Sequence, residues 1–298
     1  MMSLTEALVG LYIYPIKGFG IHAAGLPQVQ VQPSIGFIGD RAFGFAIKEV
    51  PAGEHRPKDY FLTGMRYPQL LSYIARSNSG SDLHITFPEG WEASFWEPDN
   101  PAAVALCQKL KQELGIAEDV RLVSSENALT YTDSAQPNIT LGNAGTVRAF
   151  GAFLQARGVK ATVTPNRFRW NMLVNVPAFE ELTWIGQDVE IGGITFHVYE
   201  ALGRCAQIAA DPYDGTRDVP TMLKYLRDFE RENGIDRGKS PPVMGVKLLA
   251  KTEGQLKLPS HRLPANICPF CRGTGFIAPN GKEGIHTFCN GTGLRPPT

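Results

Sequence analysis

The sequence has few charged residues and no excess of either sign. Asp, Glu, Lys and Arg make up 19% of its 298 residues, and 29 basic side chains balance 29 acidic ones. A chain without net charge has no overall positive field that attracts nucleic acid, so we expect no nucleic-acid partner. Apolar residues make up 43% of the chain, which is enough for a buried core and excludes an intrinsically disordered protein.

A long hydrophobic run is also missing. No uninterrupted apolar stretch approaches the ~18 residues that a membrane-spanning helix needs, so we expect no membrane span. The first residues, MMSLTEALVGLYIYPIK, include Glu6 and no basic residue before their apolar stretch. This pattern is not that of a signal or transit peptide. We therefore expect a cytoplasmic protein.

Glycine and proline, with 31 and 22 copies, leave little room for long helices. Short alternating or β-branched segments predict strands at residues 28–31, 83–87, 120–123, 172–176 and 189–199, the last with a turn at Gly192-Gly193. Helical periodicity predicts helices at residues 102–114, 146–155 and 220–232. This pattern is typical of a mainly β (α+β) protein with two β-barrel-like domains and a few helices.

Two changes in composition divide the chain. A polar stretch near residues 124–128 follows the first strand-rich half, and the segment after Leu249 has weak periodicity and two prolines, as a linker does. We therefore expect a first β-barrel domain at 1–125, a second domain at 126–252, a linker at 253–265 and a small tail at 266–298.

The tail concentrates metal-binding side chains. Three of the five cysteines lie in its last 31 residues, which suits a metal site better than a disulfide framework. The segment CPFCRGTG is followed by a near copy, HTFCNGTG, so Cys268, Cys271, His286 and Cys289 form two ligand-x-x-ligand turns. Two such turns suit tetrahedral Zn²⁺. Iron in a rubredoxin-like site is the alternative, but those sites use four thiolates, and His286 favours zinc.

These tail residues resemble the zinc knuckles of DnaJ-type chaperones, whose unit is Cys-x-x-Cys-x-Gly-x-Gly. The tail contains two such knuckles, whereas that family has four, and His286 replaces one cysteine. The resemblance implies a zinc-binding tail that contacts another protein.

Two features of the main body admit two interpretations. Strand alternation in RFRWN would place Arg167, Arg169 and Asn171 on one face. That face is either an anion-binding edge or an ordinary exposed strand face. Cys205, which follows Arg204, is either a small buried apolar side chain or a thiolate that cationic neighbours activate as a nucleophile or metal ligand.

Seven motifs together resemble the MOSC proteins, a family named after the C-terminal domain of molybdenum cofactor sulfurase. In chain order they are YPIK, GDRAF, MRYP, RFRWN, W-x-x-x-x-V-x-I-G, GRC and DPYDG. The resemblance covers roughly residues 7 to 250 and includes the N-terminal MOSC β-barrel domain. It is strongest to the branch that contains the mitochondrial amidoxime-reducing component and bacterial relatives that detoxify N-hydroxylated bases.

The resemblance implies a molybdenum cofactor, a pyranopterin, and roles for individual residues. Cys205 would ligate molybdenum, and Asp211, in the DPYDG turn, would lie beside the metal as a second catalytic residue. The cofactor would be held by Lys17, Arg41, Thr140, Asn143, Arg167, Arg169 and Asn171. The family also carries an association with pyridoxal phosphate binding.

The implied function is an oxidoreductase that reduces small N-hydroxylated substrates. Some bacterial relatives carry a ferredoxin domain where this chain has its cysteine-rich tail, so an external electron-donor protein is expected. Trp170 and Gly18 depart from the proline and serine that the family usually has at these positions. The alternatives are a non-redox carrier of sulfur or cofactor on Cys205, and a zinc-dependent interaction protein whose barrel has lost its cofactor.

We predict one zinc ion per chain, held by Cys268, Cys271, His286 and Cys289, in a structural site because all four ligands are protein side chains. Metal analysis of the purified Cys271→Ala variant should show loss of zinc, and proteolysis should cut faster only after about residue 260, since metal binding supplies the folding free energy of so small a tail. Loss of enzymatic activity in proportion to zinc removed by a chelator would contradict a purely structural site.

Overall fold

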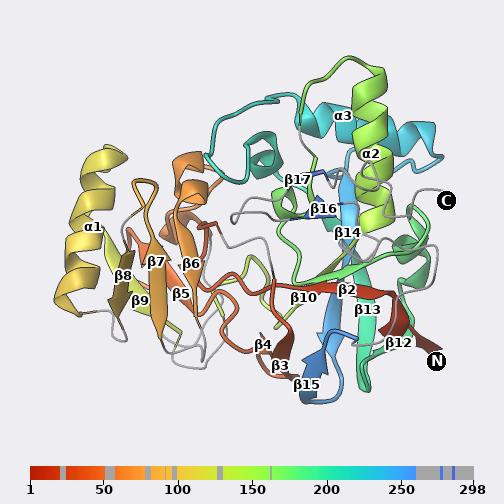
Figure 1. The fold of residues 1–298 in the computed structure, drawn as a ribbon, viewed down its shortest axis with the longest axis horizontal. Coiled ribbons are helices and arrows are strands. Elements are labelled where there is room, and N and C mark those ends of the chain that lie inside the picture. Colours follow the sequence, from red (N-terminus) through yellow and green to blue (C-terminus); the bar gives the residue numbers. More distant parts are fainter. Residues whose placement is uncertain are drawn as a thin grey trace.

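The computed structural model describes residues 1–20, 25–50, 58–77, 82–90, 92–95, 99–125, 130–161 and 163–259, and the backbone of 276–277 and 284–285. These residues form several sheets and three α-helices, in agreement with the predicted mainly β (α+β) class. Figure 1 shows a smaller body around α1 and a larger body around α2 and α3.

The larger body is built on one curled sheet of seven strands. Its order is β1 (Met2–Ser3), β12 (Asp188–Ile191), β13 (Ile194–Gly203), β14 (Val243–Ala250), β10 (Ile139–Asn143), β11 (Met172–Val174) and β2 (Leu8–Leu11). The pairs β1–β12 and β10–β11 are parallel and the other pairs are antiparallel. The sheet is thus a half-barrel, where the sequence analysis expected a barrel-like domain.

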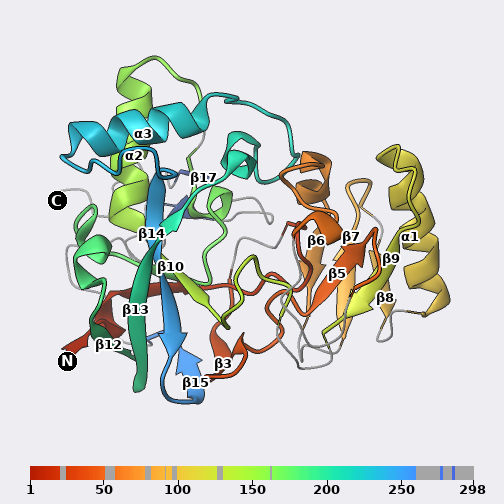
Figure 2. The same cartoon turned by 180° about the vertical axis from the view of Figure 1, so that it is seen from behind.

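Successive strand residues point to opposite sides of this sheet, and another layer packs against each side. Phe196, Val246 and Leu248 face a layer formed by β15 (Gly254–Lys257), β3 (Gln28–Gln32) and β4 (Gly36–Phe37). Leu173 and Met244 face α2 (Ala144–Ala156) and α3 (Met222–Glu232), which Figure 2 shows together at one end of the sheet.

The smaller body combines two small sheets with α1 (Pro101–Glu113), which Asn100 caps by accepting a hydrogen bond from Ala102 N. One sheet pairs β5 (Phe43–Ala46) with β9 (Arg121–Ser124), and the other contains β6 (Ile74–Arg76), β7 (Leu83–Thr86) and β8 (Glu92–Phe95). Single bridges Ile16–Phe43 and Gly20–Ile74 join the two sheets through residues 16–20.

The remaining described elements are short. They are the 3-10 helices η1 (Thr5–Ala7), η2 (Lys58–Tyr60), η3 (Pro68–Ser72), η4 (Pro165–Arg167), η5 (Glu180–Trp184) and η6 (Ala206–Ala209), and the pair β16 (Phe276–Ile277) and β17 (Gly284–Ile285). No helix in the described part of the chain has both the length and the apolar character needed to cross a membrane.

Most of the expected local elements are confirmed. Each predicted strand and helix is present with ends shifted by a few residues, and residues 189–199 divide into β12 and β13 at Gly192-Gly193. Both glycines have positive φ, 59° and 80°, as a tight hairpin turn requires.

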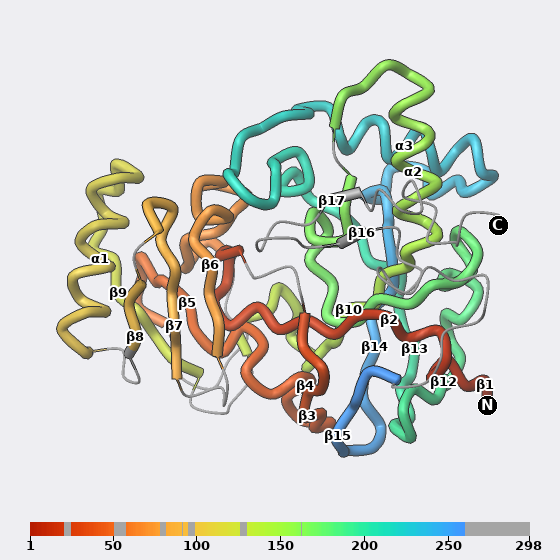
Figure 3. The backbone as a smooth tube through the Cα atoms, viewed as in Figure 1, coloured from red at the N-terminus to blue at the C-terminus, as the bar shows by residue number. Residues whose placement is uncertain are grey.

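The sheets do not follow the expected boundaries at residues 125 and 253. Strands β1 and β2, from the first eleven residues, pair with β12 and β11 of the larger body. Gly254–Lys257, which the sequence analysis places in a linker, forms β15 with Leu256 fully buried. Figure 3 follows the N-terminal segment across the larger body before it enters the smaller one.

The turn at residues 211–215 joins the two bodies. A Cβ atom on Gly215, whose φ is +74°, would lie 2.1 Å from the carbonyl oxygen of Pro68 in η3. Next to this contact, Arg217 donates to Met65 O at 2.7 Å and to Ala206 O at 3.5 Å. The bodies therefore meet through a close backbone approach that only glycine permits.

We predict that Gly215→Ala destabilises the protein far more than Gly234→Ala. Gly234 has a similar φ of +76° but open space where a Cβ would be, so its substitution costs only the left-handed backbone term of about 1–2 kcal/mol. Gly215→Ala adds a steric term of about 1–3 kcal/mol. Urea denaturation of both variants measures the difference, and equal losses would show that the Pro68 contact is easily relieved.

Candidate functional site

A cleft of about 270 Å³ lies between the two bodies and is rich in positive charge. One of its lining residues, Asp133, is acidic, whereas seven are basic: Lys17, Lys58, Lys247, Arg41, Arg167, Arg169 and Arg204. The smaller body and its entry segment contribute Lys17, Arg41 and Lys58. This excess of cations makes the cleft suited to an anion.

Cys205 lies in the wall of this cleft, at the end of the longest strand. Strand β13 ends at Gly203, and Cys205 is the residue before η6. Its side chain is exposed, whereas the other described cysteine, Cys107, is buried. Of the two interpretations open for Cys205, the small buried apolar side chain is therefore wrong.

Arg167 anchors the segment that follows Cys205. Its guanidinium makes a bidentate ion pair with Asp218, at 2.9 and 2.7 Å, and donates to the carbonyl oxygens of Ile208 and Ala210. The side chain is fully buried. A buried arginine needs such a set of acceptors. The two carbonyl acceptors belong to the residues three and five positions after Cys205.

The expected strand face of Arg167, Arg169 and Asn171 is wrong. Pro165 starts η4, which ends at Arg167, and β11 begins only at Met172. Arg169 has a φ of 59°, in the left-handed region. The arginines therefore separate: Arg167 turns towards Asp218, and Arg169 stacks on the ring of Tyr14 at 4.3 Å.

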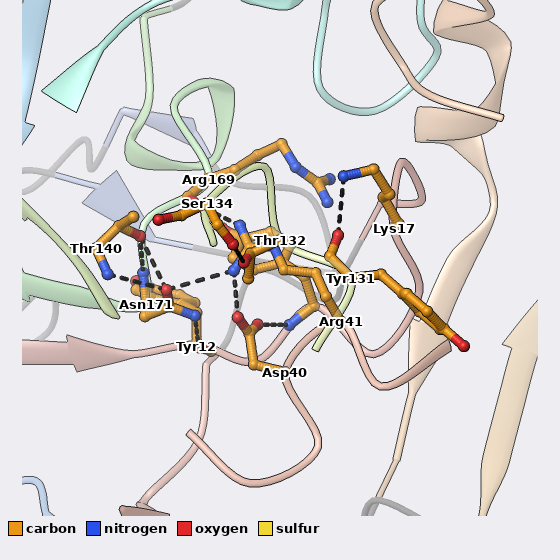
Figure 4. A network of polar contacts seen from close by, with 11 residues as sticks. Tyr12, Lys17, Asp40, Arg41, Tyr131, Thr132, Ser134, Thr140, Arg169 and Asn171 are labelled. Atoms are coloured by element: carbon orange, nitrogen blue, oxygen red, sulfur yellow. Dashed lines mark hydrogen bonds and ion pairs between the residues drawn. The ribbon is translucent and has the colours of Figure 1, made fainter. Parts of the chain in front are cut away.

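Asn171 and Thr140 form a buried, hydrogen-bonded pair beside Arg41 (Figure 4). Asn171 Oδ1 accepts hydrogen bonds from Thr140 N at 3.1 Å, Thr140 Oγ1 at 2.9 Å and Arg41 Nη1 at 3.3 Å. Arg41 also pairs with Asp40, whose charge raises the pKa of Arg41 against the opposing effect of burial. Thr140 lines the cleft, whereas Asn171 supports it from behind.

Lys17 enters the same network from the segment after β2. Its ammonium donates to Tyr131 O at 2.8 Å and pairs with Asp133. Burial lowers the pKa of Lys17, and the opposite charge of Asp133 only partly offsets this effect.

Arg204 rests on aromatic rings beside Cys205. Its guanidinium lies 5.1 Å from the Trp170 ring centroid and 5.6 Å from that of Phe168, and it donates to Met244 O and Phe168 O. Trp170 fits because Gly142 and Gly245 leave its indole room, and a Cβ on Gly142 would lie 2.0 Å from it. Trp170 stands where the family usually has proline, and its ring supports the wall of the cleft under Arg204.

Arg169 and Arg204 carry charges that no acid neutralises among the described residues. Neither forms a salt bridge there, and both donate only to backbone carbonyls. Burial lowers the pKa of Arg169 to about 10 and that of Arg204 to about 9. Two desolvated cations without a salt-bridge partner in the described structure favour the binding of an anion.

Two expected site residues serve the fold instead of lining the cleft. Asn143 caps α2 by accepting a hydrogen bond from Gly145 N, and its amide donates to Pro177 O and to the buried Glu181. Asp211 Oδ1 accepts from Tyr213 N at 2.8 Å and so holds its own turn. Neither is among the residues that line the cleft.

Four residues contribute to the cleft or its support although they were not expected as site residues: Arg204, Gln207, Asp40 and Tyr14. Arg204 and Gln207 flank Cys205, and this proximity was an available signal. Gln207 Nε2 is buried without a hydrogen-bond partner in the described structure, and it lines the cleft as a donor for a ligand. The contacts of Asp40 and Tyr14 depend on folding and have no local signal.

The proposed zinc ligands Cys268, Cys271, His286 and Cys289 lie outside the described residues. Within the described ranges, no group of three or more His, Cys, Asp or Glu side chains is arranged to hold a metal ion. The tail site therefore stays a prediction from sequence.

The cleft thus combines an exposed thiol with an excess of cationic side chains, a combination suited to an anionic group. Comparison with protein families supports a particular class, because residues 138–258 match the family model of the MOSC domain. The match runs from β10 to β15 and includes Cys205 and Arg169. No curated protein matches the chain.

The MOSC domain is associated with the molybdenum cofactor at the family level. The residues present fit such a group. A pterin dithiolene is polyanionic, which suits Arg169 and Arg204; Cys205 offers a soft thiolate; and Gln207 Nε2 is an orphaned donor.

We predict that Arg167 and Arg169 differ in what they stabilise. Arg167→Met should lower the free energy of unfolding by about 1–3 kcal/mol, because it leaves the buried carbonyl oxygens of Ile208 and Ala210 without their donor. Arg169→Met removes a desolvated charge with no acidic partner in the described structure, so the melting temperature should stay equal or rise. Thermal denaturation of both variants without ligand tests this, and a large destabilisation by Arg169→Met would assign that residue to the fold.

Proposed function

We propose that the cleft binds the molybdenum cofactor and that the chain is an oxidoreductase that reduces small N-hydroxylated compounds. The observation that carries this proposal is the exposed Cys205 in a wall that also contains Arg169 and Arg204. The MOSC match at residues 138–258 supports the cofactor class. Electrons would come from a separate redox protein.

Each wall of the cleft has its own task in this proposal. Cys205 is the protein ligand of the metal, at the end of β13. Arg169, Arg204 and Lys17 bind the negative charges of the pterin and its phosphate. Arg41, which reaches the carbonyl oxygen of Arg169, and Thr140 are joined through Asn171 and hold the adjacent edge. When bound, the molybdenum supplies two-electron oxygen-transfer chemistry.

The position of Cys205 matters as much as its identity. Arg167 donates to the carbonyl oxygens of Ile208 and Ala210, so the segment after the thiol cannot shift without breaking these two buried hydrogen bonds. Contacts behind a metal ligand orient it, so Arg167 would orient the thiol of Cys205 toward a bound metal. Arg167 and Asp211 therefore act by positioning, and Asn143 acts further away, at the α2 N-terminus.

A second candidate function is a non-redox carrier of sulfur or cofactor on Cys205. The exposure of this thiol favours it, because a carrier must present its sulfur to an acceptor. In that case Cys205 holds a persulfide and the tail contacts the recipient. The likeness to the amidoxime-reducing branch, the N-terminal MOSC barrel and the zinc-binding tail belong to the proposal and rest on sequence motifs.

We predict that Cys205→Ser leaves the protein folded but abolishes molybdenum-dependent reduction of an N-hydroxylated amidine. Cys107→Ala is the matched control, since that thiol is buried and burial raises its pKa to about 11. Molybdenum content, persulfide content and activity with a chemical reductant would be measured on protein from a cofactor-competent host. One molybdenum per chain supports the enzyme, and a persulfide without molybdenum supports the carrier. Full activity of Cys205→Ser would remove this residue from the site.

A further inference from the structure

Tyr14 lies at the centre of the cationic wall although the proposed function gives it no task. Its side chain is buried, with 2% of the residue exposed. Its ring centroid lies 4.3 Å from Arg169 Cζ and 5.0 Å from Arg41 Cζ. One aromatic ring therefore contacts two guanidinium groups that come from distant parts of the chain.

Both arginines have an unusual backbone. Arg41 and Arg169 have φ values of 49° and 59°, and among the described residues Phe179 is the other non-glycine residue with a positive φ. Backbone strain of this kind persists where surrounding contacts enforce it, and it gathers at functional sites. Here the strained positions share one ring.

The main chain of Tyr14 also fixes the segment that bears Arg41. Tyr14 N donates to Asp40 Oδ1 at 2.8 Å, and Arg41 N donates to Tyr14 O at 2.7 Å. Arg41 Nη2 reaches Arg169 O at 3.5 Å. Backbone and ring of one residue thus set the relative position of both arginines.

An aromatic ring holds a cation without neutralising it. A carboxylate in the place of Tyr14 would bind Arg169 more strongly, but it would cancel the charge that attracts an anion. Arg169 has no acidic partner in the described structure, and its guanidinium donates to the carbonyl of Phe19. The ring therefore orients a cation that stays available to a ligand.

We propose that Tyr14 is a positioning residue that holds Arg41 and Arg169 together as one receptor for a phosphate-like anion. The inference rests on the proposed function only in taking the natural anion to be part of the cofactor. It predicts that the aromatic ring, and not simply a filled core position, determines anion affinity.

The test uses the full chain, purified without cofactor, and inorganic phosphate as the probe. The melting temperature at increasing phosphate concentration gives an apparent Kd, because a ligand that binds only the folded state raises stability. Tyr14→Leu should weaken phosphate binding about tenfold, and Tyr14→Phe, which keeps the ring, should stay within about twofold of the parent. Arg169→Met should abolish the rise in melting temperature with phosphate, which would show that phosphate binds at Arg169.

Phe37→Leu is the matched control. Phe37 is a buried aromatic residue, 1% exposed, in the neighbouring strand β4, and the structure shows no cation over its ring among the described residues. This variant should lose stability but keep the parent Kd for phosphate. If Tyr14→Leu does not fold, Tyr14→Met fills more of the space and gives the same comparison.

Parent-like phosphate affinity of Tyr14→Leu, or equal weakening by Phe37→Leu, would overturn the inference, as would a parent protein that phosphate does not stabilise. A phosphate effect that depends on Tyr14, in a protein that never acquires molybdenum, would overturn the proposed function alone.

Discussion

The ion pair between the buried Arg167 and the partly exposed Asp218 positions the segment that follows Cys205 in the candidate site. It joins η4, just before β11, to the segment after Cys205, and it closes the carbonyls of Ile208 and Ala210 onto the same guanidinium. Loss of the Arg167 guanidinium would leave these two buried carbonyl oxygens without their donor, which costs about 1–3 kcal/mol. The position of Cys205 therefore depends on a guanidinium whose hydrogen bonds and ion pair all go to the protein itself.

The site also shows where stability and ligand binding oppose each other. Arg41 and Lys17 have acidic partners, Asp40 and Asp133, whereas Arg169 and Arg204 are held by rings and backbone carbonyls. The pKa values of these last two are lowered by burial, which means that the fold carries an electrostatic cost in the absence of an anion. Such a cost is typical of binding sites, where preorganised charge is retained for the ligand.

The local sequence pattern predicted most helices and strands, but it did not predict how they pair and pack. The alternation at 28–31 and the Gly192-Gly193 turn are encoded within a few residues, and the structure confirms both. The pairing of β3 with β15 joins residues more than 200 positions apart, and no periodicity reveals it. Six of the expected site residues line the cleft: Cys205, Lys17, Arg41, Thr140, Arg167 and Arg169. The expected strand face failed because Pro165 starts a 3-10 helix and Arg169 is left-handed, which alternation cannot anticipate.

The N-terminal segment runs through both bodies, and both bodies contribute residues to the cleft. Strand β2 is hydrogen-bonded to β11 in the larger body, and residues 16–20 bridge to β5 and β6 in the smaller one. Between these anchors lie Tyr12, which is bonded to Asn171, and Tyr14, which carries the two arginines. Together with the Gly215 contact on Pro68, this segment connects the bodies on two sides of the cleft. The segment that links the bodies therefore also carries the ring that contacts Arg41 and Arg169, so the relative position of the two bodies and that of the two guanidinium groups are coupled.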